Sequence, residues 1–97
     1  MADYSLAQAA YDDLEQIDEY TLQTWGDEQR TRYLSDLFQQ FDLIAENPSL
    51  GKLRPELADG VQSLPLREHV IFYEVHAGRC HILRVLHHSR DLNTVFP

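Results

Sequence analysis

The chain has 97 residues, which is enough for one domain built on one core. Its 16 acidic and 8 basic side chains give a formal net charge of −8, and a field of that sign disfavours direct binding to nucleic acid. The single cysteine, Cys80, excludes an internal disulfide and a cysteine metal cluster. No basic-then-apolar leader is visible, and no apolar run approaches the roughly 20 residues that span a bilayer, so we expect a cytoplasmic protein without membrane contact.

The negative charge is concentrated in the first half of the sequence. Residues 1–47 carry eleven acidic and two basic side chains, for a net charge of −9. Residues 48–97 carry five acidic and six basic side chains, for a net charge of +1, together with all five histidines. Any function that needs positive charge is therefore expected from the second half.

A short strand around Tyr4 is expected first, followed by a helix. Ser5 and Gln8 fit a capping box at the start of this helix. Apolar positions that recur at spacings of three and four predict a buried helix face that ends at Trp25. The members of this face are Leu6, Ala10, Leu14, Ile17, Thr21 and Trp25. Gly26 is expected to end the helix in a left-handed conformation.

A second helix is expected to begin with Asp27 as its N-cap and to end at Asn47-Pro48, because the residue before a proline is disfavoured in a helix. Its apolar stripe is wide, which predicts burial against both the first helix and a sheet. The stripe consists of Leu34, Leu37, Phe38, Phe41, Ile44 and Ala45. The single residue between the two helices predicts an antiparallel αα-hairpin.

Three β-rich runs follow a loop that contains Pro48, Gly51 and Pro55. The runs cover Val61–Leu66, Glu68–Val75 and Arg79–His87, and a tight turn at His76-Ala77-Gly78 joins the last two. The segment Val70–Tyr73 is apolar on both faces, which predicts a central strand. Alternation in the last run places Leu83 and Val85 on one face, and Ile82, Arg84 and Leu86 on the other.

The order of these elements, β-α-α-β-β-β, predicts the fold class. We expect one α+β domain over residues 1–97, with the helical hairpin packed on one face of a small antiparallel sheet. An arginine inside the last strand, Arg84, further indicates that the other face is not sealed by core.

The histidine pair His87-His88 is the most reactive-looking feature of the chain. It fits a general acid–base pair or part of a metal site, although adjacent strand residues point to opposite faces and cannot easily share one ligand. The alternative is a polar strand end without a catalytic role. We expect the acidic pairs Asp12-Asp13 and Asp18-Glu19 on the solvent face of the first helix and Cys80 in apolar packing. No metal or cofactor is assigned.

The basic side chains of the second half form the other candidate site: Lys52, Arg54, Arg67, Arg84 and Arg90. They fit either ordinary surface charge or a local positive patch that meets an acidic peptide or a nucleic-acid backbone. Arginine suits such a patch, because its guanidinium group binds a carboxylate or a phosphate at two points.

The order of particular residues matches that of a known family over nearly the whole chain. The first group is Tyr4-x-Leu6, Asp13-Leu14, Ile17, Tyr20-Thr21, Trp25-Gly26, Gln29, Tyr33 and Ala45-Glu46-Asn47-Pro48. The second group is Gly51, Glu56-Leu57, Gly60, Ser63, His69-Val70-Ile71-Phe72-Tyr73 and Arg84-Val85-Leu86-His87. Each match is weak alone, and the combination is specific. The sequence resembles the ParE toxins, within the RelE/ParE superfamily of type II toxin–antitoxin modules.

The resemblance implies a RelE-like α+β fold and a toxin that is not an enzyme. It implies inhibition of DNA gyrase as the toxic activity and neutralisation by a small ParD-like antitoxin, whose C-terminal part wraps the toxin. Operator DNA would be bound only through the antitoxin. A homodimer and a toxin–antitoxin hetero-oligomer are both compatible with it.

The resemblance also divides the candidate residues. The residues expected to bind the antitoxin are Lys52, Arg54, Arg67, Phe72 and Arg84. The residues expected to carry toxicity are Arg84, His87, His88 and Arg90, because the family's toxicity is placed in the C-terminal segment.

Two alternatives remain. A RelE-like ribosome-dependent mRNA interferase would use Arg67, Arg84, His87 and His88 as catalytic residues. The chain lacks a tyrosine after residue 73, and its acidity opposes binding to ribosomal RNA, so gyrase inhibition ranks above it. The other alternative is a non-toxic module that only binds the antitoxin.

Overall fold

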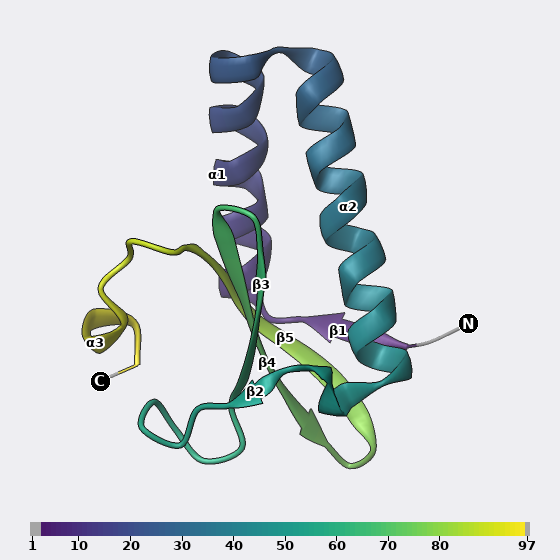
Figure 1. Cartoon of the computed structure of the whole chain (residues 1–97), viewed down its shortest axis with the longest axis vertical. Helices are drawn as coiled ribbons and strands as arrows, with labels where there is room; N and C mark the ends of the chain where they lie inside the picture. Colours follow the sequence, from purple (N-terminus) through teal and green to yellow (C-terminus); the bar gives the residue numbers. More distant parts are fainter. Residues whose placement is uncertain (1–2, 97) are drawn as a thin grey trace.

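The computed structural model describes residues 3–96. Two long helices, α1 (Gln8–Trp25) and α2 (Asp27–Glu46), form a hairpin that projects beyond a five-stranded sheet (Figure 1). The strands are β1 (Tyr4–Leu6), β2 (Lys52–Leu53), β3 (Gln62–Leu66), β4 (His69–His76) and β5 (Arg79–His87). A 3₁₀ turn, η1 (Pro48–Leu50), follows α2, and a short helix, α3 (Leu92–Val95), follows β5. The predicted α+β class and the helical hairpin are confirmed.

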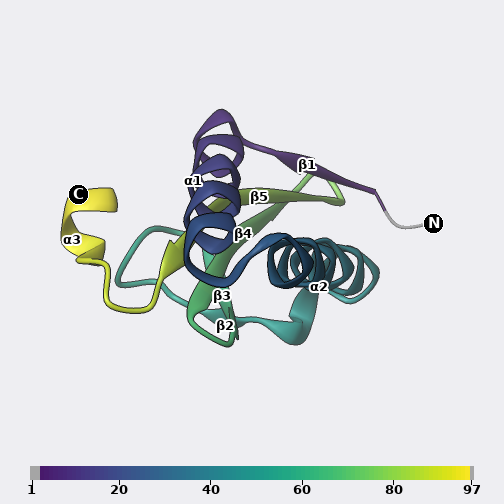
Figure 2. The ribbon, with the colours of Figure 1, turned by 90° about the horizontal axis from the view of Figure 1, so that it is seen from above.

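The helical hairpin turns through one glycine. Gly26 has φ +93° and ψ 174°, a positive-φ conformation that glycine adopts because it has no Cβ, although it lies outside the left-handed helical region that we predicted. Seen from above, α1 and α2 stand side by side, and α3 lies well away from them (Figure 2). The second helix ends at Glu46, before Asn47-Pro48, as predicted.

Two predicted caps are wrong. Ser5 lies in β1, and α1 is preceded by Ala7, which makes no side-chain cap, so the capping box with Gln8 does not form. Asp27 is the first residue of α2 and not its N-cap, which is Gly26. The Asp27 carboxylate still lies at the positive end of the helix dipole, where negative charge is favoured.

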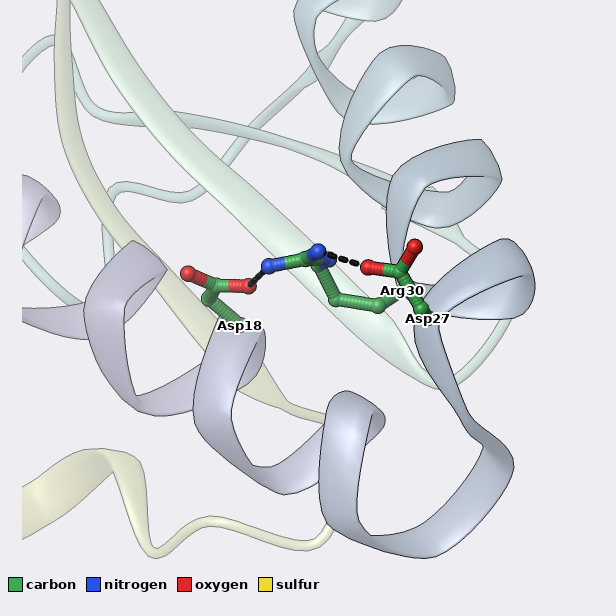
Figure 3. A network of polar contacts seen from close by, with 3 residues as sticks. All are labelled: Asp18, Asp27 and Arg30. Atoms are coloured by element: carbon green, nitrogen blue, oxygen red, sulfur yellow. Dashed lines mark hydrogen bonds and ion pairs between the residues drawn. The ribbon is translucent and has the colours of Figure 1, made fainter.

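An ion-pair network ties α1 to α2 near their connection (Figure 3). Arg30 of α2 donates from Nη1 to Asp18 of α1 at 3.1 Å and from Nη2 to Asp27. The hydrogen bonds to Asp18 and Asp27 raise the pKa of the Arg30 guanidinium group. The network therefore holds together the part of the hairpin that extends beyond the sheet.

The strand order in the sheet is β1-β5-β4-β3-β2, so β4 is central, as predicted. Neighbouring strands are antiparallel except at one edge, where β1 runs parallel to β5 with Tyr4 opposite Cys80. The sheet is thus mixed, and not purely antiparallel as expected. The helical hairpin carries the chain from β1 to the opposite edge of the sheet, and three antiparallel connections then bring β5 back beside β1 in the same direction.

A β-bulge interrupts the pairing of β4 with β5. Phe72 pairs with Arg84, whereas the next residue, Tyr73, pairs with Ile82. Leu83 is therefore the extra residue of the bulge, and it shifts the alternation of side chains along β5 by one position.

This shift changes which β5 residues share a face of the sheet. Ile82 and Val85 both belong to the core under the helices, and Leu83 and Leu86 pack in the cluster on the opposite face. The predicted grouping, Leu83 with Val85 and Ile82 with Leu86, is wrong because it assumed an unbroken alternation.

The main core lies between the helical hairpin and the sheet. Its buried members are Ala10, Leu14, Ile17, Tyr33, Leu37, Phe41, Ile44, Ile71, Tyr73, Cys80, Ile82 and Val85. A smaller cluster on the other face is built on Val61, Phe72 and Leu86, with the Phe96 ring 5.2 Å from that of Phe72. Packing of Cys80 is confirmed, and burial raises the pKa of its thiol to about 11.

Two predictions of burial on α1 are wrong. Trp25, expected in the core, is 65% exposed, because α1 extends past the sheet at this end (Figure 1). Asp13, expected in solvent, is only 5% exposed, because it faces β5. Both residues lie next to the candidate site described below.

Candidate functional site

Two adjoining pockets form a groove along α1, which we call the α1 groove. The first, here the aromatic pocket, lies between the helical hairpin and the β3–β4 turn, and is lined by Tyr20, Thr21, Trp25, Gln29, Tyr33, Arg67, Glu68 and His69. The second, here the histidine pocket, lies between α1 and the ends of β4 and β5, and is lined by Asp13, Gln16, Ile17, Tyr20, His69, Val85, Leu86, His87 and Arg90. Tyr20 and His69 border both pockets and make the groove continuous.

Exposed aromatic rings border the aromatic pocket. Tyr20 is 62% exposed and Trp25 is 65% exposed, whereas Tyr33 is buried and forms part of the pocket wall. The guanidinium carbon of Arg67 lies 5.4 Å from the centre of the Tyr33 ring, and Nη2 of Arg67 donates to Asp36 at 2.5 Å. This end of the groove can take up an apolar or aromatic side chain, because tyrosine and tryptophan supply large, rigid contact areas.

Arg67 reaches this position from a strained backbone. It begins the two-residue turn between β3 and β4, where Leu66 pairs with His69, and its φ is +53°. A side chain with a Cβ costs about 1 kcal/mol or more in this left-handed region. The ion pair with Asp36 and the stacking on Tyr33 offset part of that cost, so the turn is held in place by contacts to α2.

A line of hydrogen-bonded and stacked rings crosses the floor of the groove. The Tyr33 hydroxyl lies 2.6 Å from Nδ1 of His69, the His69 and His87 rings lie 5.7 Å apart, and the His87 and His88 rings lie 4.4 Å apart. Burial, with the nearby His87 and His88, lowers the pKa of His69. The expectation that His87 and His88 point to opposite faces is wrong, because His88 lies beyond the end of β5, where alternation no longer holds.

A buried carboxylate fixes α1 against β5 beside the histidine pocket. Asp13 accepts hydrogen bonds from Nε and Nη2 of Arg84 at 2.8 and 2.9 Å and from the backbone N–H of Val85 at 3.0 Å. β1 pairs with β5 only as far as Ile82, so the Val85 N–H has no strand partner on this edge. Asp13 therefore satisfies a buried donor and a guanidinium group at once.

The fixed charges around the groove cancel. The cations are Arg67, Arg84 and Arg90, and the anions are Asp13, Asp36 and Glu68. Arg84 is paired with Asp13 and Arg67 with Asp36, whereas Arg90 makes no ion pair within residues 3–96. Apart from its histidines, the groove therefore carries no net charge.

The structure brings some of the predicted site residues together and separates others. Arg67, His87 and Arg90 border the α1 groove, and His88 stacks on His87 at its end. Lys52 and Arg54 lie toward the other end of β3: Lys52 pairs with Ser63, and Arg54 is engaged by Glu56 and Ser63.

Two predicted residues are engaged inside the fold. The Arg84 side chain is committed to Asp13. Phe72 is 1% exposed beneath Phe96, so a partner reaches it only by displacing the C-terminal segment. The α1 groove, which Arg67, His87 and Arg90 border, remains open to a partner.

Several residues of the groove are absent from the predicted set: Asp13, Gln16, Tyr20, Trp25, Tyr33 and His69. Tyr20 and Trp25 could have been suspected from the sequence, since two large aromatic residues near the end of a polar, acidic helix need not both be buried in the core. The position of His69 beside His87 could not be predicted, because the β-bulge sets the pairing of these two residues.

Within residues 3–96, no group of three His, Cys, Asp or Glu side chains is arranged to hold a metal ion. No helix in the same residues is both long and apolar enough to cross a membrane.

Comparison with known proteins assigns the class of protein that this fold belongs to. Residues 4–92 match the family described as the ParE toxin of the type II toxin–antitoxin system parDE. A solved structure titled "Chromosomal ParDE TA system from P. aeruginosa" has the same fold, with a TM-score of 0.76 at 22% identity over 90% of this chain and 96% of that chain.

Two relatives are similar over nearly their whole length. Toxin ParE1 of Caulobacter vibrioides is 38% identical over 91 residues, covering 94% of each chain. Toxin ParE1 of Mycobacterium tuberculosis is 35% identical over 91 residues, covering 93% of each chain. The chain therefore belongs to the ParE family of type II toxins, as the resemblance predicted.

Proposed function

We propose that this ParE-family toxin inhibits DNA gyrase in the cytoplasm, and that a cognate ParD-like antitoxin neutralises it by occupying the α1 groove. The observation that carries the proposal is an open groove with exposed aromatic walls on a ParE-family fold. In this proposal the protein is not an enzyme, and operator DNA is bound only through the antitoxin. Its assembly is either a homodimer or a toxin–antitoxin hetero-oligomer.

The chemistry of the groove supports an antitoxin segment as its occupant. Tyr20 and Trp25 offer anchors of the kind that dominate binding energy at protein interfaces. A segment that folds on binding loses conformational entropy and so needs a long, wrapped surface. An antitoxin chain that continued from the groove along β3 would reach Lys52 and Arg54, which lie toward the other end of that strand.

The toxicity candidates support a separate contact with gyrase. His87, His88 and Arg90 are exposed at the end of β5. Because His87 and Arg90 also line the histidine pocket, an antitoxin in the α1 groove would cover part of the toxic surface. Neutralisation then follows from steric exclusion of the target.

A supercoiling assay tests the proposal. The purified toxin should block supercoiling by gyrase and cause cleaved DNA to accumulate, and the antitoxin should restore supercoiling. Arg90→Gln should weaken inhibition, whereas Arg79→Gln, an exposed cation at the other end of β5, should not. Unimpaired supercoiling at a large excess of toxin contradicts the proposal.

The row of rings in the groove favours one other function. Tyr33, His69, His87 and His88 lie in a row beside Arg67, each ring close to the next, and histidine is the commonest general acid–base group. An mRNA interferase would lose cleavage of ribosome-bound mRNA in His87→Ala/His88→Ala and would leave gyrase unaffected. A toxin that is harmless when expressed without its antitoxin would instead be a binding module only.

A further inference from the structure

The histidines of the α1 groove give the proposed antitoxin site a means of responding to pH. We propose, on the basis of the proposed function, that the groove binds a carboxylate-bearing segment of the antitoxin and takes up protons on His69, His87 and His88 as it does so. Neutralisation of the toxin would then strengthen as the pH falls.

The His87 ring lies edge-to-face with the His69 ring and tilted against the His88 ring, and two of the rings have a free nitrogen. Nδ1 of His69 is engaged by the Tyr33 hydroxyl, and Nδ1 of His87 lies 2.7 Å from the Ser89 hydroxyl. The backbone N–H of His88 donates to the Glu68 carbonyl at 2.9 Å, which holds this residue beside the start of β4. The Nε2 atoms of His69 and His87 have no hydrogen-bond partner within residues 3–96, and they are available to a ligand.

The charged groups that face these rings leave them without a carboxylate partner. On α1, Asp13 is hydrogen-bonded to Arg84 and to the Val85 N–H. On α2, Asp36 is paired with Arg67, and Tyr33 is a neutral phenol. From the β3–β4 turn, Glu68 is exposed at the rim, and from the C-terminal segment Arg90 adds a positive charge.

In the free toxin, burial and the neighbouring His87 and His88 lower the pKa of His69 and so disfavour its charged form. A carboxylate placed between Arg90 and the rings removes this penalty and favours the charged histidines. Because such a ligand raises the histidine pKa, linkage requires that the ligand bind more tightly at lower pH. The same linkage requires net proton uptake on binding.

An acidic protein segment fits the groove better than nucleic acid does. Ile17, Val85 and Leu86 give the histidine pocket an apolar wall, and the exposed rings of Tyr20 and Trp25 continue it. The net charge of −8 repels an extended polyphosphate along its whole length. At the usual ionic strengths, a bound peptide segment interacts only with charges within about 8–10 Å. Within the groove the fixed charges cancel, so the net charge of the whole chain does not repel the segment.

Calorimetric titration tests the inference with the full-length toxin and the protein encoded by the reading frame adjacent to its gene. We expect the dissociation constant to fall by about tenfold from about pH 8 to about pH 6, where histidine protonates. Titrations in buffers of different ionisation enthalpy should show protons entering the complex.

Variants at exposed positions assign the effect to these histidines. His87→Gln/His88→Gln should reduce the pH dependence to the part contributed by His69, whereas Arg90→Gln should weaken binding at every pH and keep the slope. The matched control is His76→Gln, an exposed histidine at the other end of β4. An antitoxin with its C-terminal Asp and Glu residues changed to Asn and Gln should lose the slope with the wild-type toxin.

The outcomes separate the inference from the proposed function. Absence of binding at every pH contradicts the proposed function. Tight binding with an affinity that does not change with pH, or a slope that is undiminished in His87→Gln/His88→Gln, overturns the inference alone. A short single-stranded RNA that binds the groove and displaces the antitoxin overturns the choice of an acidic protein segment.

Discussion

Asp13 and Arg84 join the first helix to the last strand through an ion pair whose carboxylate is buried. The two hydrogen bonds from Arg84 are 2.8 and 2.9 Å long, and a third bond from the Val85 N–H completes the coordination of the Asp13 carboxylate. The hydrogen bonds with Asp13 also raise the pKa of Arg84. This pair therefore holds α1, one side of the α1 groove, against β5, the other side. Arg84 thus shapes the groove by positioning its walls and not by contacting a partner.

Removal of Arg84 should destabilise the protein strongly. Arg84→Ala leaves the Asp13 carboxylate buried without its cation, which typically costs about 3 kcal/mol. Arg79→Ala removes an exposed cation that makes no ion pair within residues 3–96, and should change the free energy of unfolding by less than about 0.5 kcal/mol. Urea denaturation measures both variants, and equal effects would show that the pair contributes no net stability.

The elements with long sequence patterns and the short strand around Tyr4 could be predicted, whereas two other short elements could not. The spacing of apolar residues defines α1 and α2, and Pro48 marks the end of α2. The two-residue β2 and the four-residue α3 are too short to carry a period. The parallel pairing of Tyr4 with Cys80 joins residues far apart in the sequence, which no local pattern reports.

The bulge at Leu83 explains why the site was only partly predicted. An unbroken ladder counted from the β4–β5 turn places His69 opposite Leu86, whereas the bulge places it opposite His87. The basic residues were identifiable from the sequence alone, but their ion pairs were not. Arg67 and Arg84 therefore looked unpaired, although each forms an ion pair with an acidic side chain of the same chain.

Trp25 should contribute to antitoxin binding and not to stability. Because its side chain is mostly exposed, Trp25→Ala should change the free energy of unfolding by less than about 0.5 kcal/mol. A tryptophan anchor at an interface contributes about 2 kcal/mol or more, so the dissociation constant should rise by at least about 30-fold. Tyr11→Ala, an exposed aromatic of the same helix outside the groove residues, is the matched control. Equal affinities of the two variants would exclude the aromatic pocket as the antitoxin site.

Gly51 should tolerate no side chain, because it packs against Tyr73. The Gly51 N–H donates to the Tyr73 hydroxyl at 2.7 Å, and that hydroxyl donates to the Pro48 carbonyl at 2.7 Å. A Cβ at position 51 would lie 2.7 Å from Cε1 of the fully buried Tyr73 ring. Gly51→Ala should therefore destabilise by about 1–3 kcal/mol, as overpacking does. Gly51 has φ −78°, which any residue adopts, so the cost there comes from the clash. Gly60→Ala, at φ +78° and with nothing within 4 Å of a Cβ, pays backbone strain without a clash, and thermal denaturation compares the two.

Cys80 should be unreactive in the folded toxin. Burial raises the pKa of its thiol to about 11, so the thiolate is scarce at neutral pH and is also shielded from reagents. A disulfide reagent should label it only as fast as the protein unfolds, and labelling should become rapid in urea. Rapid labelling under native conditions would show that β5 opens locally at this position.

His69 should make the free toxin less stable in acid. Burial, together with His87 and His88, lowers its pKa in the folded state, whereas the same residue in the unfolded chain titrates near 6.5. The unfolded state therefore holds more protons in this interval, and the stabilisation present above about pH 6.5 is lost as the pH falls toward the folded-state pKa. His69→Gln should reduce this slope in urea denaturation measured from about pH 7.5 to about pH 5.5, and His76→Gln should keep it. The antitoxin complex should show the opposite trend, because a carboxylate beside the ring favours the protonated form. A slope that is unchanged in His69→Gln would assign the acid sensitivity to other groups.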